Sequence, residues 1–384
     1  MKILVISNGY PTPKDPQLGC FERDQAVALK QLGHEVAVLS VDTRFRWYKR
    51  KRGVSVFQED GLSVFWGYWI PMALIRGRRI RDRIICHFYD KVYSRLVKEW
   101  GKPDILFAHF QRNIYFSLYL KKKYNVPLVG MEHWSVLMQS QLPAFALQRG
   151  AVAYPGADKL LSVSRALSES LRQKFNVASE VVNDMLGPEF LEYTPSPRKK
   201  DAPFRYIAIG TLLPRKGFDL LIKAFAESGL ASRGCLLSII GEGPERPALE
   251  QMIAELGLQN SVRLLGRKVK TEIVQALRDS DVFVLSSRAE TFGVVCIEAQ
   301  SQGLPCVATI CGGPEEFITE KDGVLIPPEN VEELTKAMAY VHDNYSKYDR
   351  AEISAQCIGQ FSPRVIATQL TGIFEDLVSK YNRK

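Results

Sequence analysis

The sequence predicts an α/β protein with two doubly wound domains, each built on a parallel sheet. The chain has 384 residues, which is enough for two globular domains of ordinary size. Short apolar runs alternate with amphipathic segments and glycine-bearing loops, as in βαβ units. A Pro-rich stretch at 193–203 interrupts the pattern, which then restarts. We therefore expect an N-terminal domain at 1–192, a linker at 193–203 and a C-terminal domain at 204–362, with an amphipathic helix at 363–384 completing the first domain.

The N-terminal domain opens with a predicted βαβ unit. Residues 2–7 form an apolar run that is typical of a buried parallel strand. Residues 19–32 carry apolar side chains at helical spacing and stop at Gly33, where a left-handed cap is expected. Residues 35–40 are the next strand. Further strands of this domain are predicted at 105–108, 128–131 and 159–163.

The C-terminal domain repeats this alternation. Helices are predicted at 217–226 and at 244–256, the second ending at Gly257. Strands are predicted at 204–209, 236–240, 262–265, 281–286, 305–309 and 323–326. Ligands bind beyond the carboxyl ends of the strands in open parallel sheets. Two such domains facing a central cleft would hold a ligand between them.

Composition excludes several classes of protein. With 46% hydrophobic and 24% charged residues, the chain is neither disordered nor fibrous. The first apolar run is too short for a signal peptide, and no stretch approaches the roughly 20 apolar residues of a membrane span. The seven cysteines include no C-x-x-C pair, which favours reduced, buried thiols. We expect a cytoplasmic protein, either free or peripheral on the inner face of the plasma membrane.

The positive charge is concentrated in the first half. Residues 1–190 contain 28 Lys and Arg against 17 Asp and Glu, whereas the remainder contains 23 against 25. A polyanionic partner should therefore meet the first half. Nucleic acid, an anionic membrane and an anionic lipid head group all fit this charge.

Two carboxylates follow the strand predicted at 281–286. Glu290 and Glu298 are separated by seven residues, and Gly293 between them is placed to open a helix. Eight residues of helix span about 12 Å, roughly the length of a sugar diphosphate ribose. Carboxylates accept hydrogen bonds from sugar hydroxyls, and free N–H groups at a helix start suit an anion. The plain alternative is two exposed glutamates near a helix N-terminus, where acidic residues are common.

A second strand-end loop carries two adjacent cations. Arg215 and Lys216 stand just before a predicted helix, after the glycine Gly210. Cations backed by a helix N-terminus can receive a leaving diphosphate. A solvated basic turn is the alternative. Two further glycine loops follow strands, at 241–244 and 312–313.

In this order the segments resemble the retaining nucleotide-sugar glycosyltransferases of family four, which have the two-Rossmann GT-B architecture. The resemblance covers nearly the whole chain and is sharpest from 205 to 330. The residues that carry it are Glu290 and Glu298, the segments 214–217 and 241–244, Gly312-Gly313, and Gly33-His-Glu-Val36.

The resemblance implies roles for the donor-side residues. Glu298 would bind the nucleotide ribose, and Lys216 the diphosphate. Many members of the family carry Arg directly after the glycine of the first strand, where this chain has Thr211; Arg215 is the candidate replacement. The remaining nucleotide-side candidates are Gly210, Gly241 and Arg267. The hydroxyls of the transferred sugar would be held by Glu290, Thr291, Phe292, Gly293 and Val294.

On the N-terminal side, His133 matches a histidine beside the transferred sugar, and His109 is a second candidate on the acceptor side. Both follow predicted strands. The turn at Gly19 matches a loop that approaches the phosphates and the acceptor. The catalytic candidates are thus His133, Glu290, Lys216 and Arg215.

The resemblance also implies a reaction. A hexose-type sugar would move from a nucleotide diphosphate sugar, with UDP favoured over GDP, to a glycan or lipid-linked acceptor of cell-envelope or exopolysaccharide synthesis. The configuration at the anomeric carbon would be retained. The leaving phosphate would take the acceptor's proton, and neither a metal nor a further cofactor would be needed.

The basic residues of the first half cluster beside aromatic residues. Residues 44–52 hold six cations and residues 76–83 hold five, the latter preceded by the aromatic stretch 65–70. This pattern suits an anionic membrane surface, and a solvated basic loop is the alternative. No nucleic-acid-binding module is recognised, so nucleic acid is not expected as a partner. The competing functions are a nucleotide-sugar 2-epimerase of the same fold and a basic nucleic-acid-binding protein without catalysis.

Overall fold

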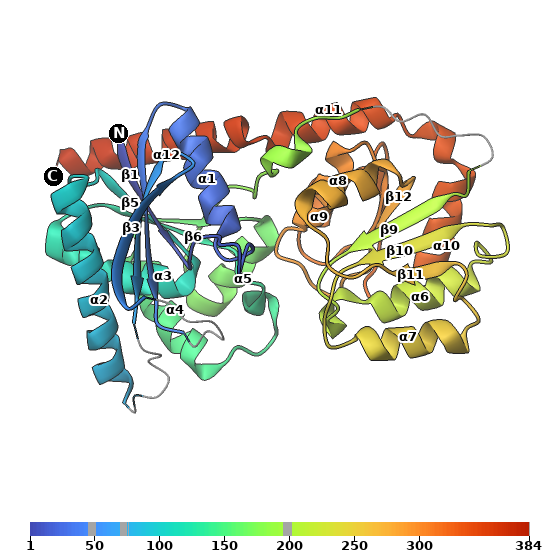
Figure 1. Ribbon diagram of the computed structural model, residues 1–384, viewed down its shortest axis with the longest axis horizontal. Helices are drawn as coiled ribbons and strands as arrows, with labels where there is room; N and C mark the ends of the chain where they lie inside the picture. Colours follow the sequence, from blue (N-terminus) through green and yellow to red (C-terminus); the bar gives the residue numbers. More distant parts are fainter. Residues whose placement is uncertain (45–50, 70–74, 76, 195–201, 384) are drawn as a thin grey trace. The chain divides into compact units, whose positions relative to one another are not determined.

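The computed structural model describes residues 1–44, 51–69, 75, 77–194 and 202–383, and the chain divides into two compact units (Figure 1). Unit 1 comprises Met1–Asn183 and Pro363–Lys384, and unit 2 comprises Asp184–Ser362. Most of the expected linker, residues 195–201, lies outside the described residues.

The division between the units falls between Asn183 and Asp184, ahead of the expected linker. Residues after this point pack on unit 2. The Leu186 N–H donates to the Phe361 carbonyl oxygen at 2.9 Å, and Gln302 Nε2 donates to the carbonyl of the fully buried Phe190 at 3.3 Å. The segment that follows Asn183, whose regular structure is the short 3₁₀ turn Pro188–Phe190, therefore belongs to unit 2 because it packs on that unit.

The described residues of unit 1 form an eight-stranded sheet. Its strands are β1 (Lys2–Ser7), β2 (Glu35–Asp42), β3 (Gly53–Glu59), β4 (Leu62–Tyr68), β5 (Ile105–His109), β6 (Leu128–Glu132), β7 (Lys159–Ser162) and β8 (Glu180–Val181). Their order is β3-β4-β2-β1-β5-β6-β7-β8, and only β3 and β4 pair antiparallel. The chain runs outward from β1 and later returns to pair β5 beside it, which places the switch point of this sheet between β1 and β5.

Helices complete unit 1. They are α1 (Cys20–Gln31), α2 (Arg78–Glu99), α3 (Phe110–Tyr124), α4 (Ala144–Gly156), α5 (Arg165–Phe175) and the last helix of the chain, α12 (Pro363–Asn382). The last helix belongs to this unit because its side chains enter the core, where the Phe374 and Phe107 rings lie 5.0 Å apart. His34 Nε2 also lies 2.9 Å from Thr371 Oγ1 on the same helix.

The hairpin β3–β4 corrects part of the interpretation of the aromatic stretch 65–70. Phe65 is a residue of β4 and is only 2% exposed, because β4 pairs with β2 inside the sheet. Its ring is therefore a core residue and not a lipid contact. Ile70, at the end of the stretch, lies outside the described residues, as do 45–50 and Arg76 of the two basic clusters.

Unit 2 has the strand order of a dinucleotide-binding fold. Its strands are β9 (Arg205–Ile209), β10 (Leu236–Ile240), β11 (Val262–Leu264), β12 (Val282–Leu285), β13 (Cys306–Thr309) and β14 (Gly323–Ile326). They pair parallel in the order β11-β10-β9-β12-β13-β14, which places the switch point between β9 and β12. Its helices are α6 (Phe218–Glu227), α7 (Arg246–Glu255), α8 (Lys270–Arg278), α9 (Val294–Ser301), α10 (Val331–Asp343) and α11 (Arg350–Phe361).

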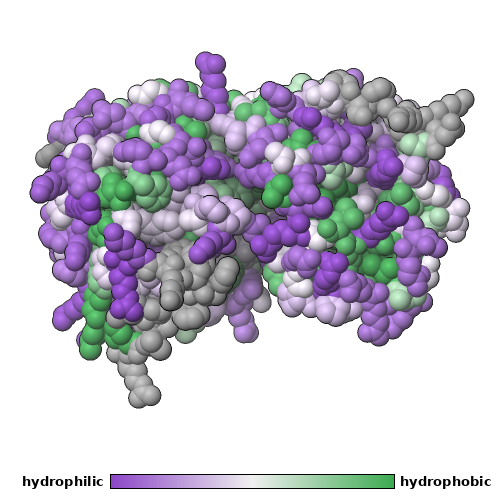
Figure 2. Space-filling model, viewed as in Figure 1, coloured by the Kyte–Doolittle hydropathy of each residue, from purple (hydrophilic) through white to green (hydrophobic). Residues whose placement is uncertain are grey.

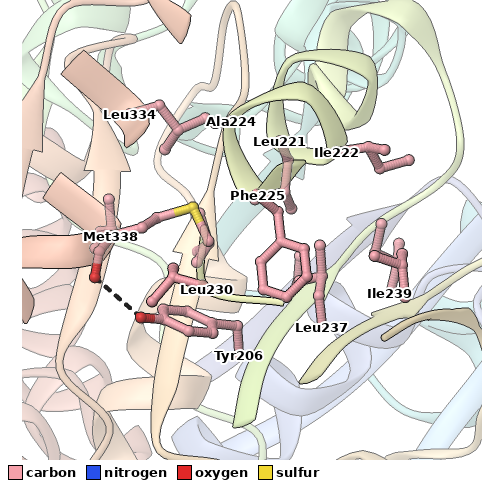
Figure 3. Close-up of a cluster of buried hydrophobic side chains, with 14 of the residues drawn as sticks. Tyr206, Leu221, Ile222, Ala224, Phe225, Leu230, Leu237, Ile239, Leu334 and Met338 are labelled. Atoms are coloured by element: carbon pink, nitrogen blue, oxygen red, sulfur yellow. Dashed lines mark hydrogen bonds between the residues drawn. The ribbon is translucent and has the colours of Figure 1, made fainter. Parts of the chain in front are cut away.

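The core of unit 2 is a cluster of buried hydrophobic side chains between the sheet and its helices (Figure 3). Phe225 of α6 and Met338 of α10 are fully buried against Tyr206 of β9. The Tyr206 hydroxyl donates to the Met338 carbonyl oxygen at 2.9 Å, so the one polar atom of this ring is satisfied. The helices are thereby fixed against the sheet whose loops carry the candidate site.

Within the described ranges, none of the helices combines the length and apolarity that a bilayer crossing requires. All seven cysteines carry free thiols, and five of them are buried. Burial raises the pKa of the Cys86 thiol to about 11 and that of the Cys357 thiol further still. These thiols are therefore protonated at neutral pH.

Candidate active site

The donor-side candidates of unit 2 lie at the carboxyl ends of neighbouring strands. Gly210 follows β9, Gly241 follows β10, Glu290 follows β12 and Gly312 follows β13. Because these strands are parallel and adjacent, their loops share one edge of the sheet. Lys216 and Glu290 come from the two loops that flank the switch point.

The two flanking loops approach each other closely. Gly217 has a positive φ of 63°, and a Cβ at this position would lie 2.0 Å from the Ser286 carbonyl oxygen. Only glycine fits such an approach. The Ser286 hydroxyl adds a hydrogen bond to the Lys216 carbonyl oxygen at 3.1 Å. The short 3₁₀ turn Pro214–Lys216, called η4, is therefore held against the loop after β12.

Two cations converge on the Glu290 carboxylate. Lys216 Nζ donates to Glu290 Oε1, and Arg215 Nη1 lies 4.0 Å from Glu290 Oε2. The Ser287 hydroxyl donates to Oε1 at 2.7 Å. The Glu290 side chain is only 8% exposed and that of Lys216 only 11%, so the pair is held largely out of water. Three residues predicted from two separate motifs are thus brought together.

The backbone around Glu290 is also fixed. Its N–H donates to the Cys311 carbonyl oxygen at 2.9 Å, which ties the loop after β12 to the loop after β13. Gly293, with a φ of 92°, caps the N-terminus of α9. The Phe292 side chain is buried against Phe317 and Phe361, at ring distances of 5.2 and 5.6 Å. Phe292 can therefore contribute only its backbone to a ligand site.

The other nucleotide-side candidates lie at the same edge of the sheet. Glu298 is half-buried in the second turn of α9. Arg267 is exposed after β11, and the neighbouring Gly266 accepts a hydrogen bond from the Gly241 N–H at 2.9 Å. The half-buried Thr291 and Val294 lie on either side of the pair Phe292 and Gly293.

Ser287 and Arg288 were not predicted as site residues. Both belong to the loop after β12, and their side chains contact residues of that loop or of the turn η4. The available signal was their place between a buried strand and Glu290, which does not reveal where a side chain points.

On unit 1 the two candidate histidines form a pair. His109 ends β5 and is fully buried, and its Nδ1 lies 3.0 Å from Nε2 of the half-buried His133. Burial, with the nearby His133, holds the pKa of His109 well below its ordinary value, so His109 is neutral. His109 can therefore reach a ligand only through His133.

The loop that holds His133 is fixed by the buried carboxylate of Glu132. Glu132 accepts the N–H groups of His133 and Trp134 at 2.9 and 3.0 Å, and its other oxygen accepts the Tyr154 hydroxyl at 2.7 Å. Gly19, the third candidate of this unit, caps α1 with a φ of 72°. A Cβ there would lie 2.3 Å from the Gly9 carbonyl oxygen, so this turn packs directly on the loop after β1.

We expect acid to destabilise the chain through His109. Its pKa in the folded chain lies well below the ordinary histidine value of about 6.5, so no stability is lost through His109 above pH 6.5. Below that pH His109 is protonated in the unfolded chain but not in the folded chain. The free energy of unfolding therefore falls by up to about 1.4 kcal/mol per pH unit. Denaturant unfolding between pH 7 and 5 should give a shallower slope for His109→Asn than for the wild type. His87→Gln, an exposed site on α2, is the control, and equal slopes for all three proteins would contradict the assignment.

Two sequence families match the chain. The family described as "Glycosyl transferases group 1" matches residues 190–356, and "Glycosyltransferase Family 4" matches residues 23–183. Together the matches span most of both units and identify the chain as a group 1 glycosyltransferase. No group of three or more His, Cys, Asp or Glu side chains that could hold a metal ion occurs in the described part of the chain.

Known proteins agree with this assignment. Glycogen synthase of Mycobacterium tuberculosis is 25% identical over 400 residues, covering 97% of this chain and 94% of that protein. The lipopolysaccharide core biosynthesis glycosyltransferase LpsE of Rhizobium meliloti is 34% identical over 169 residues, 43% of this chain and 48% of that one. The structure of Anabaena HepE in complex with UDP and glucose superposes with a TM-score of 0.75 at 20% identity, covering 98% of this chain and 100% of that one. The fold is therefore GT-B.

Proposed function

We propose that the chain is a retaining glycosyltransferase that moves a hexose-type sugar from a UDP-sugar to a glycan or lipid-linked acceptor of cell-envelope or exopolysaccharide synthesis. The observation that carries this proposal is the convergence of Arg215 and Lys216 on Glu290 at the switch point of unit 2. A buried carboxylate suits sugar hydroxyls, and cations beside it suit a diphosphate.

The proposed chemistry follows from these charges. Lys216 and Arg215 turn from Glu290 toward the donor's diphosphate and stabilise the charge that develops as the sugar leaves, so that no metal is required. Glu290 accepts hydrogen bonds from the sugar hydroxyls, with the backbone of residues 291–294. Glu298 binds the ribose, and the loops of Gly210, Gly241 and Arg267 line the nucleotide. The leaving phosphate takes the acceptor's proton.

Unit 1 supplies the acceptor side in this proposal. His133 approaches the transferred sugar, His109 holds His133 in place, and the turn at Gly19 approaches the phosphates and the acceptor. The choice of UDP is supported by the complex of HepE, and that of an envelope acceptor by the name of LpsE.

A panel of nucleotide sugars tests this function. Thermal shift with UDP-, GDP- and ADP-linked hexoses should give the largest stabilisation with a UDP-sugar, since a ligand that binds the folded state raises the melting temperature. Transfer assays with that donor should then yield a product with the anomeric configuration of the donor. An inverted product would refute retention. Release of free sugar and nucleotide without any acceptor would instead indicate a 2-epimerase.

We further propose that unit 1 docks on the anionic inner face of the plasma membrane through α2 and α4. Arg79 and Arg83 are exposed near the start of α2, and Figure 2 shows hydrophobic residues along this part of α2 with hydrophilic residues beside them. Arg78 of α2 donates to Gln148 of α4. On α4 itself, large apolar side chains are exposed: Phe145, Leu147 and Val152, at 52%, 42% and 50%.

Vesicle sedimentation tests this surface. The wild type should bind vesicles containing anionic phospholipid more strongly than neutral ones, and less strongly as salt rises. The double variant Phe145→Ser and Val152→Ser should lose several-fold in binding, because two exposed apolar side chains are removed. Val269→Ser, which changes a side chain of unit 2 that is 62% exposed, is the control. Equal, salt-independent binding to both kinds of vesicle would refute the proposal.

A further inference from the structure

Arg288 joins the two loops that flank the switch point of unit 2. Its backbone N–H donates to the Arg215 carbonyl oxygen at 2.8 Å, and its Nη1 donates to the Pro214 carbonyl oxygen. Nη1 and Nη2 also donate to the two carboxylate oxygens of Asp219, at 3.0 and 2.9 Å. Nε donates to Glu329 Oε1 at 3.1 Å. One residue thus holds two carbonyls of the turn η4 and the first turn of α6.

The Arg288 guanidinium is already committed to protein groups. Its paired hydrogen bonds to Asp219 have the fork geometry in which arginine binds carboxylates most strongly. Burial alone would raise the pKa of Asp219, but the hydrogen bonds from Arg288 hold it below its ordinary value. Asp219 is therefore ionised at neutral pH and the pair is intact. All four of these guanidinium hydrogen bonds go to protein oxygens, so Arg288 is better placed to position the turn η4 than to bind phosphate.

We propose that Arg288 is a positioning residue, which fixes the turn η4 so that Arg215 and Lys216 present their charges to the diphosphate of the donor. This inference rests on the proposed function. The hydroxyl of Ser286 holds only the Lys216 carbonyl, whereas Arg288 holds those of Pro214 and Arg215. A preorganised cation stabilises a diphosphate better than one that must be ordered on binding.

Calorimetry with UDP and UMP tests this role. Arg288→Gln should weaken UDP binding about tenfold, a size typical of coupled neighbours, and leave UMP binding within about twofold. The difference arises because UMP lacks the second phosphate. Asp219→Asn removes the carboxylate that accepts the paired hydrogen bonds of Arg288, and it should reproduce the loss of UDP affinity. The double variant should lose no more than either single variant, because both changes remove one unit.

Controls separate positioning from general stability. Arg233→Gln removes an arginine–aspartate pair elsewhere in unit 2, where Arg233 Nη2 lies 2.5 Å from Asp343 Oδ1, and should leave UDP binding unchanged. Arg288→Lys keeps the positive charge but cannot form the paired hydrogen bonds to Asp219, and it should give an intermediate loss of UDP affinity. Should Arg288→Gln fail to melt cooperatively, Arg288→Lys and Asp219→Asn make the comparison.

Each remaining outcome counts against the proposal. Equal losses for UDP and UMP, or the same loss in Arg233→Gln, would show that Arg288 is merely structural. Unchanged UDP binding in both Arg288 variants would overturn the inference directly. A wild type that binds no UDP, GDP or ADP would overturn the proposed function instead, and the wild-type measurement alone distinguishes that failure.

Discussion

Glu290→Gln is expected to lower kcat for sugar transfer by about 10²- to 10³-fold, the size seen when one group that stabilises a transition state is removed. The amide keeps the volume of the side chain and can still accept a hydrogen bond from Ser287. It loses the negative charge that strengthens hydrogen bonds from sugar hydroxyls. Steady-state kinetics with a saturating donor measures the effect.

The same variant should bind UDP at least as tightly as the wild type. In the free enzyme the Glu290 carboxylate competes with phosphate for Lys216, which it binds directly, and for Arg215 at 4.0 Å. Removing the charge frees both cations. Glu272→Gln is the control, because it changes an exposed glutamate in the first turn of α8, whose carboxylate pairs with Lys268 at 3.0 Å. Wild-type kcat in Glu290→Gln would refute the assignment, and a rise in KM alone would reduce Glu290 to uniform recognition.

The shared edge of the sheet at which Lys216 and Glu290 lie was predictable from pattern rules. Each follows a strand that the apolar runs predict, and parallel strands place their following loops at one edge. The strand order β9-β12 then makes the two loops neighbours although 74 residues separate them. The sequence could not show in which direction the side chains of these loops point. Whether Arg215 points toward Glu290 or into solvent depends on the turn η4, whose shape is set by tertiary contacts with Arg288 and Ser286.

Unit 1 was less predictable, for physical reasons. His109 was expected on the acceptor side; its side chain is fully buried, and its Nδ1 lies 3.0 Å from Nε2 of His133, the residue that directly follows β6. Successive side chains of a strand point to opposite faces of the sheet. In a strand that is buried on both faces, apolar and polar residues do not alternate, so the sequence does not show to which face the last side chain points. The hairpin β3–β4 was missed because basic and aromatic residues around it suggested a surface, whereas pairing with β2 buries Phe65.

Lys216→Ala is expected to have the other large effect, a loss of about 100-fold in UDP affinity and a comparable fall in kcat. The cation lost is 11% exposed, so its interaction with a phosphate is screened less than that of a surface lysine. The substitution also leaves the buried Glu290 with Ser287 and with Arg215 at 4.0 Å, so part of the loss is repulsion between this carboxylate and the diphosphate. The double variant Lys216→Ala and Glu290→Gln should therefore recover part of the UDP affinity but none of the kcat.

Variants of Arg215 and Thr211 test which further cation binds the diphosphate beside Lys216. Arg215→Ala alone should weaken UDP binding about tenfold, because a second, more exposed cation is removed. If Arg215 replaces the arginine that many family members carry after the glycine of the first strand, then Thr211→Arg in the Arg215→Ala background should restore most of the affinity. Lys268→Ala, which breaks the exposed pair with Glu272 in the same unit, should change neither affinity nor kcat. Failure of Thr211→Arg to restore binding, with Lys216→Ala still strongly impaired, would show that Lys216 meets the diphosphate alone.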